Sequence, residues 1–130
     1  MSVQVQWDNP EKTILRYDMS GKWTWDEFFN AYEAGRALMN TVSHKVNFIL
    51  NPTDEISRTY TPPNAMSHMI SIGRKAHPMA GKTVSISNNT FTRVLLQMVS
   101  KVNPKIAEMY AFADSLEDAR VMLAKDSVPR

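Results

Sequence analysis

The most suggestive chemical pattern in the chain is the segment 76–83, which reads Ala-His-Pro-Met-Ala-Gly-Lys-Thr. It fits a relaxed phosphate-loop pattern with alanine at the first position. A working phosphate loop follows a strand and opens a helix, so that backbone N–H groups and the helix dipole face the phosphates. Here the order is inverted, because a helix is predicted to end at Pro78 and Lys82 begins a strand. We therefore do not expect nucleotide binding through this segment.

The histidines and serines of the chain are not spaced for metal binding or catalysis. His44, His68 and His77 show no i,i+4 pairing, and there is no cysteine to complete a metal site. Ser67 and His68 are neighbours on a predicted helix and point about 100° apart, so they do not form a nucleophile–base pair. The sequence thus predicts no metal, no cofactor and no enzymatic activity.

Small polar residues follow the segments that we predict as strands. In an open α/β sheet, ligands and partners use the rim at the carboxyl ends of the parallel strands. The candidate partner or ligand rim comprises Asn51, Asp54, Ser57, Arg58, Thr61, Asn64, Met66, Ser87, Asn88 and Asn89. Helix N-termini at this rim could hold an anion or a peptide. Helix capping explains the same residue types, so both interpretations stay open.

Two segments of alternating hydrophobicity begin the chain. Val3, Val5 and Trp7 alternate with glutamines, which is typical of a half-buried strand. Turn residues follow, and a second strand is predicted over residues 12–19. The short polar connection between them favours an antiparallel hairpin, with the first strand at or near an edge of the sheet.

A long helix is predicted next. Thr24 stands three residues before Glu27, the spacing of a capping box. The apolar stripe of this helix is formed by Trp25, Phe28, Phe29, Tyr32, Met39 and Val42. The aromatic side chains could form a stacking platform, but their three- and four-residue spacing is already explained by packing in the core.

The rest of the chain alternates between strands and helices. Strands are predicted over 46–50, 83–87 and 109–113, and a polar loop over 51–63 follows the first of them. The helix between strands 46–50 and 83–87 is opened by Pro62-Pro63 and ends at Pro78. Its predicted buried face comprises Met66, Met69, Ile70, Gly73 and Ala76, with Met66 and Met69 partly exposed.

Two more helices complete the pattern. One follows Asn88-Asn89-Thr90 and ends at Asn103-Pro104, and its predicted apolar stripe comprises Phe91, Val94, Leu95, Met98, Val99 and Val102. The last begins at Ser115 and carries Leu116, Ala119 and Leu123. The predicted fold class is α/β: one domain over residues 1–130, with a mixed five-stranded sheet, an antiparallel first strand, parallel strands after it, and about four helices on both faces.

Composition narrows the functional classes. The 130 residues carry 15 basic and 13 acidic side chains, a net charge of +2 that does not by itself imply a polyanionic partner. Basic residues gather near 74–82 and acidic residues near 114–118. Both groups are explained as surface charges near helix ends, where cations in the last turn and anions in the first turn oppose the helix dipole. There is no signal-peptide pattern and no apolar run of the ~20 residues that span a bilayer, so a soluble cytoplasmic protein is expected. RNA binding needs aromatic side chains on an exposed sheet face, and since helices are predicted to cover both faces, no nucleic-acid binding is expected.

The order strand, strand, helix and then three strand–helix units resembles the STAS domain of anti-sigma-factor antagonists. The resemblance is closest to the divergent bacterial branch grouped with the Sec14 lipid-binding fold, and it covers nearly the whole chain. It rests on this element order, on Val46–Leu50 with its polar loop, and on the helix start at residues 115–119. Antagonists of the phospho-switch type carry an Asp-Ser stretch at the second helix, where this chain has Thr61-Pro62-Pro63-Asn64-Ala65. The phosphorylated serine is therefore absent.

The resemblance implies a non-catalytic regulatory domain of bacterial cytoplasmic signalling that binds a protein partner. The loop 51–63 and the helix after it are the expected contact region, and a homodimer stays open. The alternative, implied by the Sec14 branch, is a domain that binds a small apolar ligand or lipid between a helix and the sheet. Nine methionines suit an adaptable pocket, although methionine also fills ordinary cores.

Overall fold

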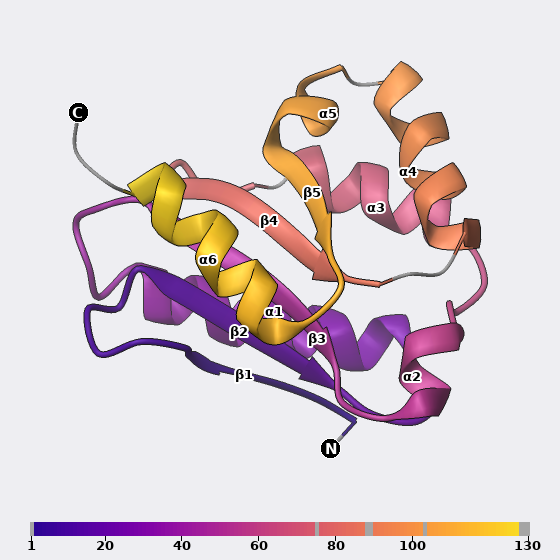
Figure 1. Cartoon of the computed structure of the whole chain (residues 1–130), viewed down its shortest axis with the longest axis horizontal. Coiled ribbons are helices and arrows are strands. Elements are labelled where there is room, and N and C mark those ends of the chain that lie inside the picture. Colours follow the sequence, from indigo (N-terminus) through magenta and orange to yellow (C-terminus); the bar gives the residue numbers. More distant parts are fainter. Residues whose placement is uncertain (1, 75, 88–89, 103, 128–130) are drawn as a thin grey trace.

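Five strands form one mixed sheet whose spatial order, β1-β2-β3-β4-β5, follows the order of the chain (Figure 1). A computed structural model describes residues 2–74, 76–87, 90–102 and 104–127. The strands are β1 (Val3–Trp7), β2 (Ile14–Met19), β3 (Val46–Pro52), β4 (Ala80–Ile86) and β5 (Tyr110–Ala113). β1 pairs antiparallel with β2, and every later pair of neighbours is parallel. The predicted mixed α/β sheet with an antiparallel edge strand is confirmed.

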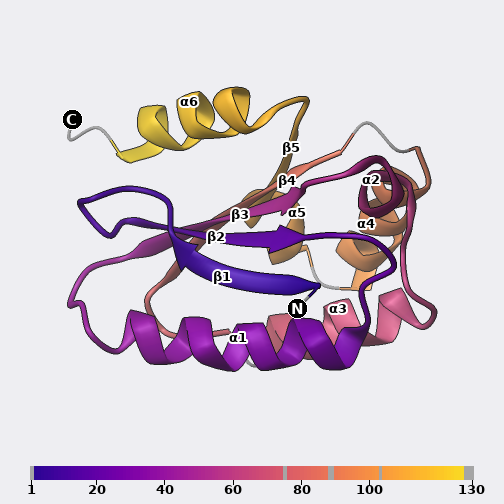
Figure 2. The same ribbon diagram turned by 90° about the horizontal axis from the view of Figure 1, so that it is seen from below.

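Helices cover both faces of the sheet, but unequally. They are α1 (Trp25–Met39), α2 (Glu55–Thr59), α3 (Ala65–Arg74), α4 (Thr90–Val102), α5 (Lys105–Met109) and α6 (Leu116–Ser127). Because each parallel strand is added on the same side of the one before it, right-handed crossovers bring their connecting helices to one face. Figure 2 shows α1 and α3 below the sheet and α6 above it. α6 contacts β3, β4 and β5, while Gln4 and Gln6 of β1 are exposed on that side.

The alternation of side chains along the strands builds one apolar cluster on each face. On the α1 side, Leu15 and Tyr17 of β2 are buried together with Phe28 of α1. On the other face, Ile49 of β3 packs in a smaller cluster with Leu123 of α6. The sheet is therefore held between α1 and α6, each of which buries its own apolar stripe.

Hydrogen bonds confirm the predicted starts of α1 and α6. The Thr24 hydroxyl accepts from the backbone N–H of Glu27 at 3.2 Å, and the Glu27 carboxylate accepts from the N–H of Thr24 at 3.1 Å. The Ser115 hydroxyl accepts from the N–H of Asp118 at 3.1 Å. Both caps satisfy backbone donors that the first turn of a helix leaves without partners.

The segment predicted as a single polar loop, 51–63, is more structured than expected. β3 continues to Pro52, and the short helix α2 follows it because the Asp54 carboxylate caps its first turn. α3 begins at Ala65, after the two prolines, with Asn64 in the left-handed region at a φ of 63°. It ends at Arg74, four residues before Pro78, so Ala76, predicted to be buried on this helix, is instead exposed beyond it.

The C-terminal half confirms one prediction and corrects two. A phosphate loop would place Lys82 at the start of a helix, but Lys82 lies inside β4. The rejection of a phosphate loop at this segment is therefore confirmed. The short helix α5 was not predicted. Of the predicted stripe on α4, the side chains of Phe91 and Leu95 lie outside what the structure describes. Val99 is buried as predicted, but Val94, Met98 and Val102 are exposed, and Leu96, which is not part of the stripe, is buried. The reason is that α4 packs beside α3 and α5 and turns a different side inward.

Candidate functional site

A partly open cavity of about 440 Å³ lies between the α1-side face of the sheet and the helices that cover it. Side chains of β2, β3 and β4 form one wall, and α1 and α3 form the other. The apolar and aromatic lining includes Tyr17, Met19, Trp23, Trp25, Phe28, Phe48, Leu50, Met69, Ile72, Val99 and Met109. Since α2 follows β3 and α5 precedes β5, these two helices close opposite rims of the sheet. Both also contribute to the lining.

Aromatic side chains form the wall nearest the start of α1. The rings of Trp23 and Trp25 meet edge to face with centroids 5.0 Å apart, and both lie 5.9 Å from the Phe28 ring. The Trp25 indole N–H donates to the carbonyl of Pro63 at 2.9 Å, which ties the segment before α3 to α1. The Trp23 indole N–H is buried without a partner among the described residues. Trp23 therefore contributes packing, and Trp25 also positions the wall.

The rim beside α2 is organised by Asp54. Its carboxylate accepts from the N–H of Gly21 at 2.9 Å and from the N–H of Ser57 at 2.8 Å. These backbone hydrogen bonds lower the pKa of Asp54 below its ordinary value. Lys22 also lies over the Tyr60 ring, 6.0 Å from its centroid. The connection after β2 and the helix after β3 are thus joined at one rim of the cavity.

The polar groups of the cavity are mostly uncharged hydroxyls. Burial raises the pKa of Tyr110 to about 12, although a hydrogen bond with the Ser85 side chain opposes the rise. Burial also raises the pKa of Tyr17, with smaller contributions from Tyr32 and Glu33. Both phenols are therefore neutral at physiological pH. The charged residues in the described lining, Arg58 and Lys105, are basic, and that lining contains no Asp or Glu.

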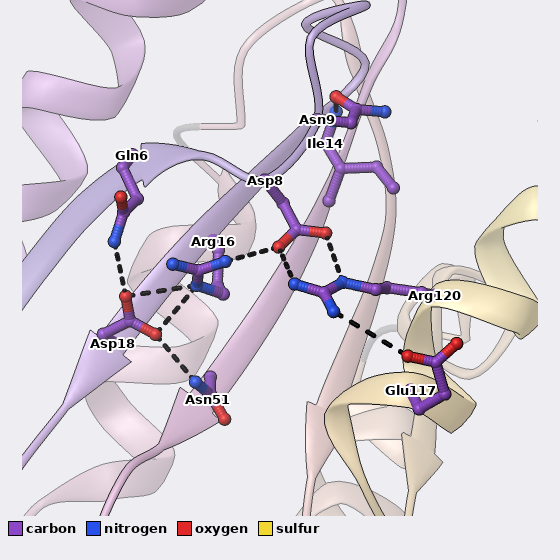
Figure 3. Close-up of polar contacts among 9 residues, drawn as sticks. All are labelled: Gln6, Asp8, Asn9, Ile14, Arg16, Asp18, Asn51, Glu117 and Arg120. Atoms are coloured by element: carbon purple, nitrogen blue, oxygen red, sulfur yellow. Dashed lines mark hydrogen bonds and ion pairs between the residues drawn. The ribbon is translucent and has the colours of Figure 1, made fainter.

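The opposite face of the sheet carries a network of ion pairs (Figure 3). The Asp8 side chain, 2 % exposed, accepts from Arg16 Nη1 at 2.5 Å and from Arg120 Nε and Nη2 at 2.9 and 2.8 Å. Burial alone would raise the pKa of Asp8, but the hydrogen bonds and charges of Arg120 and Arg16 outweigh it and lower that pKa. Because Arg120 belongs to α6, Asp8 fastens the C-terminal helix to the hairpin.

The same network extends along β2 to β3. The Asp18 carboxylate accepts from Arg16 Nε at 3.0 Å, from Gln6 at 2.8 Å and from the Asn51 amide at 2.7 Å. A shallow depression of about 470 Å³ lies beside these residues. Its charged groups, Arg16 and Asp18, already neutralise each other. We therefore interpret this network as a structural fastening.

The structure distributes the predicted rim residues among several places. Ser57, Arg58, Thr61 and Ser87 come together in the lining of the cavity. Asp54 caps α2 beside them, but Asn51 joins the network on the opposite face.

Four further positions complete the comparison. Asn64 is exposed before α3, and Met66 is half-buried on that helix outside the cavity lining. The positions of Asn88 and Asn89 lie outside the described residues. Four of the predicted residues thus belong to the cavity lining, and helix capping explains the position of Asp54.

Sequence reasoning missed the aromatic lining and the Asp8 network. Trp25, Phe28 and Tyr32 were recognised as the inner stripe of α1, but periodicity does not show whether an inner face meets neighbours or a cavity. Asp8 is the first of the turn residues that follow the predicted first strand, and turn chemistry alone accounts for it. Its partner Arg120 lies 112 residues away, and no local pattern connects the two.

The histidines are separated in space and have partners of their own. The ring centroids of His68 and Trp25 are 4.9 Å apart, and His77 Nε2 is 2.8 Å from the Asn40 amide oxygen. Within the described ranges, no three His, Asp or Glu side chains are close enough together to hold a metal ion. In that same part of the chain, no helix combines the length and the apolar character that crossing a bilayer requires. Comparisons with models of protein families, with curated proteins and with solved structures found no match.

Proposed function

We propose that the protein binds a small apolar molecule in the cavity between the sheet and helices α1 and α3. The cavity itself is the observation that supports this function. Protein interiors are close-packed and contain few voids larger than a water molecule, whereas ligand pockets measure about 300–1,000 Å³. A volume of about 440 Å³ lies in the range of ligand pockets. This proposal takes up the alternative from the sequence, a pocket between a helix and the sheet.

The lining indicates which ligands fit. Aromatic rings and methionines from β2, α1 and α3 favour an apolar body through area burial and ring contacts. The charged side chains in the described lining are Arg58 and Lys105, so an anionic ligand group would find its counterion at one of them. A cationic ligand would have no acidic partner in the described lining. We therefore expect neutral or anionic apolar ligands to bind and apolar amines to be rejected.

A fluorescence titration tests the proposal. N-phenyl-1-naphthylamine, a neutral apolar dye, is expected to bind the protein saturably with one site per chain. Met69→Trp places extra volume inside the cavity and is expected to weaken binding about tenfold, since overpacking costs on the order of 1–3 kcal/mol. Ala34→Trp, at an exposed position of α1, is the matched control and should leave the affinity unchanged.

The outcome is decisive in either direction. Absence of saturable binding to the wild-type protein would refute the proposal. So would equal affinities of the Met69→Trp variant and the wild type, provided that both melt cooperatively. Native mass spectrometry of the purified protein adds an independent measurement, because a stoichiometric retained apolar molecule would identify the ligand class directly.

A second candidate function is the protein partner implied by the STAS resemblance. The observation in its favour is Ile56 on α2, which is 54 % exposed at the predicted contact region. Ile56→Asp should abolish co-purification of a specific partner from the source organism. Val121→Asp, at a similarly exposed position on α6, should not. Equal recovery of the partner by both variants would count against this surface.

A further inference from the structure

Helix α4 exposes a row of large apolar side chains. Val94, Met98 and Val102 are 46, 48 and 57 % exposed. Their four-residue spacing puts them on one side of the helix. Met109 of the adjoining α5 is 40 % exposed. Together these residues are four of the six large apolar side chains exposed in the described part of the chain. Scattered exposed apolar residues need no explanation, but a continuous row marks an interaction surface.

The charge of the surrounding segment is strongly one-sided. Residues 56–107 contain seven Lys and Arg and no Asp or Glu. The remaining residues carry eight basic and all thirteen acidic side chains. This acid-free segment includes α3, β4 and α4. The small net charge of the whole chain therefore conceals a molecule with a basic part and an acidic part.

Basic side chains flank the apolar row itself. Lys101 follows Met98 by three residues on α4, and Lys105 opens α5, with both side chains exposed. Arg93, also exposed, is held against the Phe112 ring at 4.9 Å and donates to the carbonyl of Ser87 at 3.1 Å. Glu108 is the acidic residue of this face; it is exposed on α5, three residues after Lys105 and next to Met109. The face thus combines an apolar ridge with a border in which Arg93, Lys101 and Lys105 outnumber Glu108.

We propose that this face, formed by α4 and α5, docks on the surface of an anionic phospholipid bilayer. A helix with an apolar side bordered by Lys and Arg lies in the membrane interface, where apolar burial and attraction to anionic head groups add together. A second copy of the chain is a poorer occupant, because a symmetric contact would bring Lys101 and Lys105 against like charges. Figure 1 places α4 at the margin of the molecule, where a flat surface can reach it.

The docking face is continuous with the proposed ligand site. Val99 of α4 and Met109 of α5 belong to the lining of the cavity. A protein held on a bilayer by these helices would therefore bring the cavity close to a source of apolar molecules. The docking proposal does not depend on that ligand, because it rests on the exposed row and the basic border alone.

Co-sedimentation with vesicles tests the docking face. The wild-type protein is expected to bind vesicles of phosphatidylcholine with phosphatidylserine, and to bind pure phosphatidylcholine vesicles weakly. Met98→Glu and Lys101→Glu should each reduce partitioning about tenfold, since one basic residue near an anionic surface contributes on the order of 1 kcal/mol and each variant adds a repelled charge. Val121→Glu, which adds the same charge on α6, should bind like the wild type.

Three results would overturn the docking proposal. The first is wild-type protein that stays in the supernatant with phosphatidylserine vesicles, and the second is a Val121→Glu variant that loses binding as much as Met98→Glu. The third is a homodimer in sedimentation velocity that Met98→Glu dissociates, which would assign the apolar row to a contact with a second copy. Circular dichroism melting of every variant establishes that the changes leave the fold intact. Dye binding by the same variants distinguishes a failure of the docking proposal from a failure of the cavity proposal, because variants that lose vesicle binding are still expected to bind the dye.

Discussion

Replacing Asp8 with asparagine tests the proposed fastening between the hairpin and α6. The substitution keeps the size of the side chain but removes the charge that faces Arg16 and Arg120. Breaking a buried ion pair by removing one partner costs about 3–5 kcal/mol, and exposure of the pair reduces this cost. Here Asp8 is 2 % exposed, but the Arg120 side chain is 39 % exposed. We therefore expect a loss of about 2 kcal/mol at neutral pH, or roughly 8 °C in Tm for a chain of this size.

The pH dependence of this loss has a definite sign. The pKa of Asp8 is lower in the folded protein than in the unfolded chain, where it is about 3.9. A depressed carboxyl pKa stabilises the fold fully above the unfolded value, and this contribution is lost as pH falls through the folded value. The stability difference between the wild type and Asp8→Asn should thus be constant from pH 7 to about 5 and shrink below about pH 4.

Urea unfolding followed by circular dichroism measures the difference at each pH. Glu117→Gln is the matched control, because Glu117 pairs with the same Arg120 at 3.8 Å but is 79 % exposed. It should change the free energy of unfolding by less than about 0.5 kcal/mol. A double-mutant cycle with Arg120→Gln should give a coupling of about 1 kcal/mol or more. An Asp8→Asn variant as stable as the wild type, or a loss that is equal at pH 7 and pH 3, would refute the reasoning.

Three further predictions concern other contacts in the fold. A Cβ at Gly35 would overlap the Tyr17 hydroxyl, so Gly35→Ala should destabilise the protein by about 1–3 kcal/mol in urea unfolding. The added change Tyr17→Phe should recover part of that loss, and no recovery would contradict the assigned clash. Thr24→Ala should cost about 1 kcal/mol by removing the α1 cap, and an unchanged unfolding midpoint would contradict the capping role. Asp54→Ala should speed hydrogen exchange at the N–H of Gly21, measured by NMR, and unchanged protection there would show that this hydrogen bond is unimportant.

The sequence by itself determined the order and type of most elements. Alternation of apolar side chains identified β1 and β2, and a three-residue spacing of Thr24 and Glu27 located the start of α1. These features depend on interactions between residues close together in the chain, which a local pattern contains in full. The parallel pairing followed from topology, since strand–helix–strand connections favour one handedness. The mixed sheet with an edge hairpin could therefore be predicted without coordinates.

Only the tertiary structure decided which apolar faces are filled and which are open. Periodicity marked Trp25 and Phe28 as inward-facing, but whether they meet side chains or a cavity depends on how far α3 lies from the sheet. In the same way, α4 has apolar residues on much of its surface, and its packing beside α3 left Val94 and Met98 exposed. The Asp8–Arg120 pair joins residues at opposite ends of the chain. Contacts across such separations depend on the assembled sheet, and no spacing rule within one element contains them.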